Sequence, residues 1–123
     1  MEKDYQECMR YMQNAKNFLK AANKEGVVYN DVKYVRIACG TAYNAVLLAL
    51  DAYLQKKESG KKAKPKSIEE YKARVTKINK KLLSYLLVAY DNLHLAGYYH
   101  GTQSVKTVQT GFDNAMSIIN YIK

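Results

Sequence analysis

Apolar residues recur three and four positions apart along almost the whole chain, and this spacing predicts helices. The first helix is expected from Asp4 to Asn23, and Gly26 lies where it would stop. Its apolar positions form one stripe, which is typical of a helix that packs against another helix. They are Tyr5, Cys8, Met12, Ala15, Leu19 and Ala22.

The second helix is predicted to begin at Asn30 or Asp31, because either side chain can accept hydrogen bonds from the free N–H groups of a first turn. It should end near Lys57. From Val35 to Leu54 it is apolar on nearly every side, so we expect it at the centre of the fold. Gly40 inside a helix costs about 1 kcal/mol relative to alanine, which indicates a packing reason for it.

The third apolar stripe stays in register from Ile68 to Ala96, and Ser67 with Glu70 forms a capping box at its start. A single helix of about 30 residues would be ~45 Å long at ~1.5 Å per residue. That is longer than its neighbours, so we favour two helices with a break near Asn79.

The last helix is predicted from Ser104 to Ile122, and no segment shows the alternation of a strand. The pattern therefore predicts one all-α domain over residues 1–123. We expect an antiparallel four-helix bundle of long helices, with Ser67–Ile78 as a candidate fifth, short helix.

The bulk composition agrees with one globular domain of 123 residues, 48% of them hydrophobic, and adds a strong basic excess of +9. A positive surface attracts polyanions such as nucleic acid. Cys8 and Cys39 lie in apolar stripes, so we expect reduced, buried thiols in a cytoplasmic protein. No apolar run approaches the ~20 residues of a membrane span, so no membrane partner is expected.

The segment Lys56–Lys66 is the most basic part of the chain, with six lysines among its eleven residues and the only proline. We expect an exposed, mobile loop. Its lysines could bind the phosphates of a nucleic acid of any sequence. The alternative interpretation is a solvated linker, which has the same composition. The candidate contacts are Lys61, Lys62, Lys64 and Lys66.

The segment before the last helix holds both histidines. Asp91, His94 and Tyr98 would share one helical face, and Asp91 could orient His94 as a general base. No nucleophile is placed nearby, so we favour His94 as a residue at the edge of the core, hydrogen-bonded to Asp91. Tyr98 and Tyr99 are adjacent and can hardly both face the core, so at least one is a candidate for partner contact.

Metal binding is not expected, and neither is any other cofactor. The four candidate ligands are Cys8, Cys39, His94 and His100, and no two are spaced as a pair on one helical face. The histidines are six positions apart, whereas a helical zinc pair needs a spacing of about four.

These features together resemble the HEPN superfamily. The buried helix reads Ala-Tyr-Asn-Ala-Val-Leu-Leu-Ala-Leu over residues 42–50, a lysine-rich loop follows, and a later helix ends in Tyr-Tyr-His-Gly. HEPN proteins are small cytoplasmic helical bundles of bacteria and archaea. Some are ribonuclease toxins, some pair with small nucleotidyltransferases and some are inactive binding domains. The chain is similar also to the ribosomal-RNA intervening-sequence bundles.

The ribonuclease motif of that superfamily has an arginine with four to six residues between it and a histidine. Counting back from His100, the arginine would fall at Leu93, His94 or Leu95, and none of these positions carries it. Asp91-Asn92 is the dipeptide most similar to the superfamily's Arg-Asn pair, and it lies too far from His100. The resemblance therefore implies the fold and a homodimer, and it argues against nuclease activity.

We expect a non-catalytic binding or interaction module, with nucleic acid or an acidic protein as partner. The Lys61–Lys66 loop and the Tyr98–His100 corner would meet that partner. One alternative is a divergent metal-independent ribonuclease that uses Asn92 and His100. The other is a purely structural protein whose charge only keeps it soluble.

Overall fold

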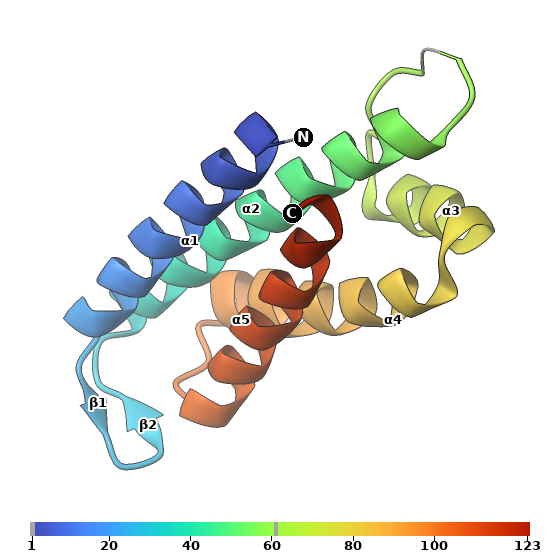
Figure 1. Ribbon diagram of the computed structural model, residues 1–123. Helices are drawn as coiled ribbons and strands as arrows, with labels where there is room; N and C mark the ends of the chain where they lie inside the picture. Colours follow the sequence, from blue (N-terminus) through green and yellow to red (C-terminus); the bar gives the residue numbers. More distant parts are fainter. Residues whose placement is uncertain (1, 61) are drawn as a thin grey trace.

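The computed structural model describes residues 2–60 and 62–123, and the fold is all-α apart from one small hairpin (Figure 1). The all-α prediction is confirmed. One α-helix, α4, continues without interruption into a π-helix, η1, and the chain ends in a 3₁₀ turn, η2. The elements are α1 (Glu2–Ala21), β1 (Lys24–Glu25), β2 (Val28–Tyr29), α2 (Val32–Lys57), α3 (Ile68–Ile78), α4 (Lys80–Ala89), η1 (Tyr90–Tyr99), α5 (Val105–Ile119) and η2 (Asn120–Ile122).

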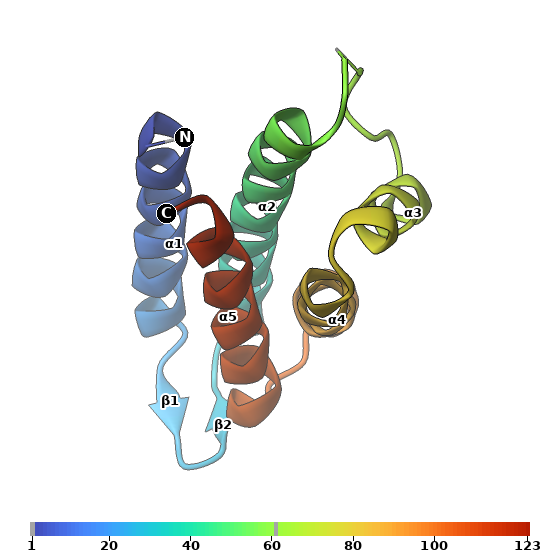
Figure 2. The ribbon, with the colours of Figure 1, turned by 45° about the vertical axis from the view of Figure 1, so that its right-hand side comes forward.

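Helix α2 lies at the centre, as its apolar sequence predicts. Helix α1 runs antiparallel along one side of it, and α5 and η1 pack against it elsewhere (Figures 1 and 2). By length and composition alone α2 could cross a membrane, contrary to the expectation from its sequence, but 61% of its most apolar window is buried inside this fold. Its buried residues are Val35, Ala38, Cys39, Ala42, Tyr43, Ala45, Val46, Ala49, Leu50, Ala52, Tyr53 and Leu54.

Three predicted helix boundaries are confirmed by side-chain caps. Asp31 begins α2, since its Oδ1 accepts a hydrogen bond from the Lys33 N–H at 3.0 Å. Ser67 begins α3, since its Oγ accepts from the Glu70 N–H at 3.1 Å. Asn79 separates α3 from α4: its backbone is extended, and its Oδ1 accepts from the Leu82 N–H at 3.0 Å.

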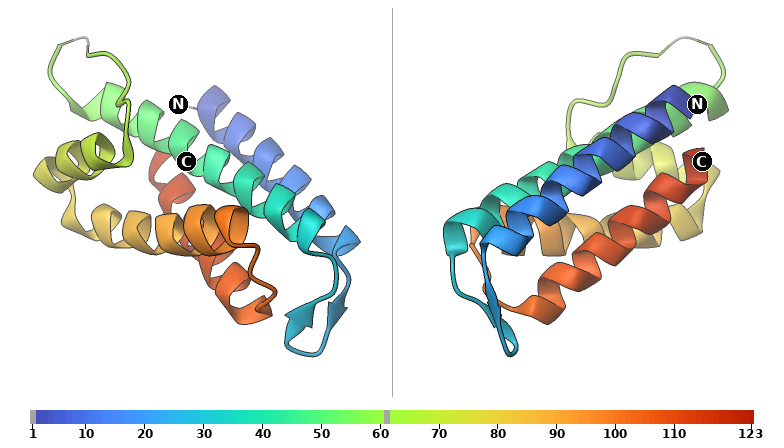
Figure 3. Two further views of the ribbon diagram at one scale, coloured as in Figure 1. Left: turned by 180° about the vertical axis from the view of Figure 1, so that it is seen from behind. Right: turned by 60° about the vertical axis from the view of Figure 1, so that its left-hand side comes forward.

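The hairpin contradicts the expectation of no strands. Gly26, at φ 62°, turns the chain so that Lys24 pairs with Tyr29. The other edge of β2 pairs with the segment before α5, where the Tyr29 N–H donates to the Gln103 carbonyl at 2.8 Å (Figure 3). Strands of two residues are too short to show an alternating pattern in the sequence.

The π-helix η1 is the second departure from expectation, because the apolar stripe predicted an ordinary α-helix through Ala96. Bonds in a π-helix run from residue i to i+5, and π-helices are rare and frequent at functional sites. At the end of η1 the His100 N–H still bonds the Leu95 carbonyl, five residues back, at 2.9 Å. The ten residues of η1 thus form wider turns than those of α4.

Helix η1 makes close contact with α2 on one side and α5 on the other. A Cβ built on Gly97 would lie 2.6 Å from the Cys39 Cβ, and one built on Gly111 would lie 2.6 Å from the Leu93 Cδ2. Both separations are shorter than real side chains adopt. Glycine at these positions therefore allows the three helices to approach as closely as they do.

Replacing Gly97 by alanine should destabilise the protein by about 1–3 kcal/mol, because the new methyl group overlaps the Cys39 side chain. Urea unfolding followed by circular dichroism measures the change. The Gly97→Ala, Cys39→Gly double variant should cost less than the sum of the single changes, since the new methyl group then no longer meets the Cβ and sulfur of residue 39. Wild-type stability for Gly97→Ala would show that this contact is not tight.

Candidate functional site

Five aromatic rings gather where η1 meets α2. His94 is at their centre: its ring centroid lies 4.8 Å from that of Tyr43, 5.2 Å from Tyr90, 6.1 Å from Tyr98 and 5.1 Å from Tyr99. Tyr90, His94 and Tyr98 are stacked in sequence, and Tyr99 meets His94 edge to face. We call these five residues the aromatic stripe. The wide turns of η1 bring residues four and five positions apart onto one face.

The aromatic stripe runs from the core to solvent. Tyr43 is buried, Tyr90 and His94 are half-buried, and Tyr98 and Tyr99 are 48% and 59% exposed. Both tyrosines of the adjacent pair are thus available, where the sequence argued for at least one. The Tyr98 ring packs on α2 at Gly40, where a built Cβ would lie 3.0 Å from the Tyr98 Cδ1. This contact is the packing reason for Gly40 that its position in the helix indicated.

His94 belongs to this stack and is not oriented by Asp91. Within residues 2–60 and 62–123 no hydrogen bond joins the two side chains, and Asp91 is exposed. The predicted pairing is wrong because residues three apart share a face in an α-helix and no longer do so in the wider π-helix. Burial lowers the pKa of His94, so its ring is neutral near pH 7.

The other residues of the ribonuclease alternative lie apart from this stack. The Asn92 amide donates to the Thr107 carbonyl at 3.0 Å, which ties η1 to α5. His100 is exposed just beyond the end of η1. Asn92 is thus already used in packing, and the structure gives His100 no acid–base partner in the part of the chain that it describes.

Two cations border the aromatic stripe, and sequence reasoning missed both. Arg36 on α2 donates through Nη1 to the carbonyl oxygens of Tyr98, at 3.3 Å, and Tyr99, at 3.0 Å. Carbonyl oxygens at a helix end carry partial negative charge, so a guanidinium is favoured there. At the other end, the Lys72 Nζ lies 5.5 Å from the Tyr90 ring centroid. Arg36 could have been found from its position one turn before Gly40, the residue predicted to face a close neighbour.

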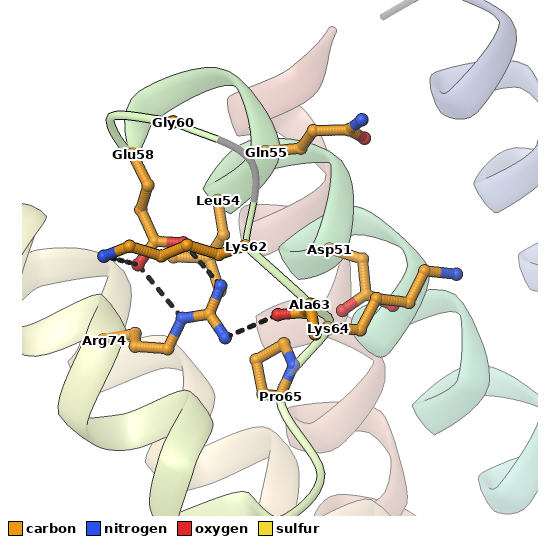
Figure 4. A pocket seen from close by; sticks show the side chains of 10 residues that line it. All are labelled: Asp51, Leu54, Gln55, Glu58, Gly60, Lys62, Ala63, Lys64, Pro65 and Arg74. Atoms are coloured by element: carbon orange, nitrogen blue, oxygen red, sulfur yellow. Dashed lines mark hydrogen bonds and ion pairs between the residues drawn. The ribbon is translucent and has the colours of Figure 1, made fainter.

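The described part of the lysine-rich loop is pinned to the fold (Figure 4). Arg74 on α3 donates through Nη1 to the Ala63 carbonyl at 2.9 Å and through Nε to Glu58 Oε2 at 3.0 Å. Pro65 is buried, and a cavity of about 560 Å³ lies under the loop beside Lys62 and Lys64. The loop is therefore not a free linker here.

The candidate lysines of the loop differ in their surroundings. Lys62, Lys64 and Lys66 are exposed, as expected, and the Lys62 Nζ lies 3.8 Å from Glu58 Oε2. Lys61 lies outside the described residues. Exposure leaves the described lysines open to solvent, and one of them already has a carboxylate partner.

The Arg74–Glu58 pair is charged and mostly enclosed, with side chains 17% and 9% exposed. The hydrogen bonds and positive charge of Arg74 hold the pKa of the Glu58 carboxyl below its usual range. Arg74 also bonds Glu70 at 3.2 Å, so the Glu70 carboxylate does not complete the predicted capping box. Each nitrogen of the guanidinium has an acceptor, so Arg74 holds the loop against α3.

The loop and the Tyr98–His100 corner are far apart. Tyr98 packs at Gly40, whereas the loop follows Lys57 at the other end of α2. At ~1.5 Å per residue these two points on the helix are roughly 25 Å apart. The structure therefore does not bring together the two surfaces that the sequence analysis assigned to one ligand.

The two cysteines are buried and free, as predicted. Burial raises the pKa of the Cys8 thiol to about 11 and that of the Cys39 thiol to about 12, so both are protonated and unreactive. Across the described ranges no three His, Cys, Asp or Glu side chains are placed to hold a metal ion.

Comparison with other proteins shows similarity over the whole described fold. The family described as Domain of unknown function (DUF5618) matches residues 3–123. A solved structure of a protein of unknown function from Dyadobacter fermentans is 34% identical, with a TM-score of 0.86 over 98% of this chain and 93% of that one. No curated protein matches the chain. Its function must therefore be argued from its own residues.

The stability of the protein should depend on the protonation of His94. Because burial lowers its pKa below the ordinary 6.5, the unfolded chain takes up this proton first as the pH falls. The free energy of unfolding should keep the full His94 contribution well above pH 6.5 and lose it as the pH falls through 6.5 toward the lowered pKa of the folded state. Urea titrations across this range measure it.

Replacing His94 by phenylalanine keeps a ring in the stack and should flatten this part of the pH profile. His100→Gln, at an exposed position, provides the matched control and should leave the profile unchanged. An unaltered profile in His94→Phe would show that His94 does not cause the dependence.

Replacing Arg74 by methionine should release the loop, because the Ala63 carbonyl and the enclosed Glu58 carboxylate lose their partner. Trypsin should then cleave faster after Lys62 or Lys66, and mass spectrometry measures the rates at these two bonds. The control is Arg10→Met, which breaks an exposed pair with Glu7 on α1. Equal cleavage rates in the wild type, Arg74→Met and Arg10→Met would show that Arg74 does not hold the loop in place.

Proposed function

As the chain belongs to the DUF5618 family, we propose from its own geometry that it is a non-catalytic binding module for single-stranded nucleic acid. The observation that carries the proposal is the aromatic stripe, which ends in two exposed tyrosines and has a cation at each end. Its scaffold, in this proposal, is the antiparallel four-helix bundle expected from the sequence, with α3 as the short fifth helix.

The exposed rings supply the stacking surface. Aromatic side chains that stack on bases contribute about 1–3 kcal/mol per base, and they do so for any base because every base has a π-face. Tyr98 is held against Gly40 and Tyr99 against His94, so neither ring must be ordered when a base arrives. Such prior ordering lowers the entropic cost of binding.

Charge supports the same ligand. The chain carries a net charge of +9, and a polyanion gains affinity from each phosphate whose counterions are released. Arg36 and Lys72 lie at the two ends of the stripe, where a backbone that follows the stacked bases would pass. Bases in a duplex are already stacked and paired, so the stripe favours single strands.

A binding role fits this site better than catalysis. His94 is neutral in a ring stack, Asn92 is used in packing and His100 is exposed without a partner in the described structure. A ribonuclease would need a base, an acid and a group that stabilises the phosphate in one place. Ribonuclease activity through His100 therefore stays an alternative, and RNA cleavage is measured in the samples used for the binding assay. The cytoplasmic location and the homodimer stay predictions, and light scattering tests the second.

Wild-type protein should bind a labelled single-stranded RNA of about eight nucleotides, with affinity that falls steeply with salt. The Tyr98→Leu, Tyr99→Leu variant should bind at least 10-fold more weakly, because leucine is apolar but cannot stack on bases. Fluorescence anisotropy measures binding, and a gel of the same samples measures cleavage.

Three comparisons make this test specific. Tyr98→Phe with Tyr99→Phe should bind as the wild type does. Tyr11→Leu removes a tyrosine that also lies beside a cation, Arg10, on α1 and should change nothing. A duplex of the same sequence should bind more weakly.

Cleavage lost in His100→Ala would favour the ribonuclease. No RNA binding at low salt would exclude the proposed function and leave an acidic protein as the candidate partner.

A further inference from the structure

Arg36 has donors that the fold does not use. Nη1 bonds the carbonyl oxygens of Tyr98 and Tyr99, whereas Nε and Nη2 have no acceptor among the described residues. The side chain is exposed. An arginine that only capped η1 would need no more than the first nitrogen, so the second edge of this guanidinium is available for a ligand.

Gly101 allows the guanidinium to take this position. A Cβ built on Gly101 would lie 2.7 Å from Nε, 2.9 Å from Nη2 and 2.7 Å from the Val32 Cγ1, and its φ of 63° also favours glycine. A larger residue at position 101 would therefore displace Arg36 from the place where Nη1 bonds the two carbonyl oxygens.

The free edge has the geometry for a phosphate. Nε and Nη2 form the planar fork that donates two parallel hydrogen bonds to phosphate oxygens. The fork is held in place by the two bonds through Nη1, so little side-chain freedom is lost on binding. It lies beside the main chain of Tyr98 and Tyr99, the residues whose rings would stack on bases.

We infer that Arg36 forms a phosphate subsite at the exposed end of the aromatic stripe. This inference rests on the proposed function and gives the strand a fixed position: a base stacks on Tyr98 or Tyr99 while the adjoining phosphate is bound by Arg36. The subsite reads the backbone and not the base, so its contribution is the same for every sequence.

The experiment compares two ligands of the same sequence, a phosphodiester oligonucleotide and its uncharged methylphosphonate counterpart. Arg36→Gln should weaken binding of the phosphodiester strand about 10-fold and reduce its salt slope by roughly 1. Binding of the uncharged strand should change less than about twofold. Arg10→Gln removes the same charge from an exposed arginine on α1 and should leave both affinities close to those of the wild type.

The two ligands separate a phosphate contact from a structural role. If Arg36 only held Tyr98 and Tyr99 in place, Arg36→Gln would weaken both strands by the same factor, and the subsite would be wrong. Unchanged binding of the phosphodiester strand would also overturn it. If the wild type binds neither strand, the proposed function fails together with the subsite.

A conservative variant covers the case in which Arg36→Gln does not fold. Arg36→Lys keeps the charge and loses the fork, so it should weaken the phosphodiester strand by an intermediate factor and leave the uncharged strand unchanged. Equal weakening of both strands in Arg36→Lys would overturn the subsite as well. Thermal unfolding of each variant establishes that the fold is intact.

Discussion

The contact between Gly97 on η1 and Cys39 on α2 is the constraint on which this end of the molecule depends. Two helices can approach to this distance only where one of them has no side chain. Once η1 lies there, Tyr98 packs on Gly40 and the last carbonyl oxygens of η1 reach Arg36. The position of every candidate binding group at the Tyr98–His100 corner follows from this one approach.

The sequence predicted the helices well, because their ends are determined by local chemistry. Asp31, Ser67 and Asn79 each cap the helix that follows, and a cap is visible in the sequence itself. The π-helix was not predictable in the same way. Its apolar positions continue the earlier stripe, and its close contacts are with α2 and α5, which lie outside its own local sequence.

The candidate site was predictable only in part, for a related reason. The tyrosine pair and the histidines stand out in the sequence, but their cations do not. Arg36 is more than 60 positions from the carbonyl oxygens that it binds, and Lys72 reaches Tyr90 from another helix. Conversely, the lysine-rich loop is conspicuous in the sequence, yet Arg74 pins its described part at the opposite end of α2. Charge density alone did not locate the aromatic site.

The pairing of β2 with the segment before α5 has a consequence for how the protein forms. The Gln103 side chain donates to the Tyr29 carbonyl across 74 positions of sequence, at 2.9 Å. Such long-range contacts are made only after the entropy of a large closed loop has been lost, and they slow folding relative to purely local helical contacts. This pairing ties the hairpin after α1 to the start of α5. It can form only when the chain from Tyr29 to Gln103 is present.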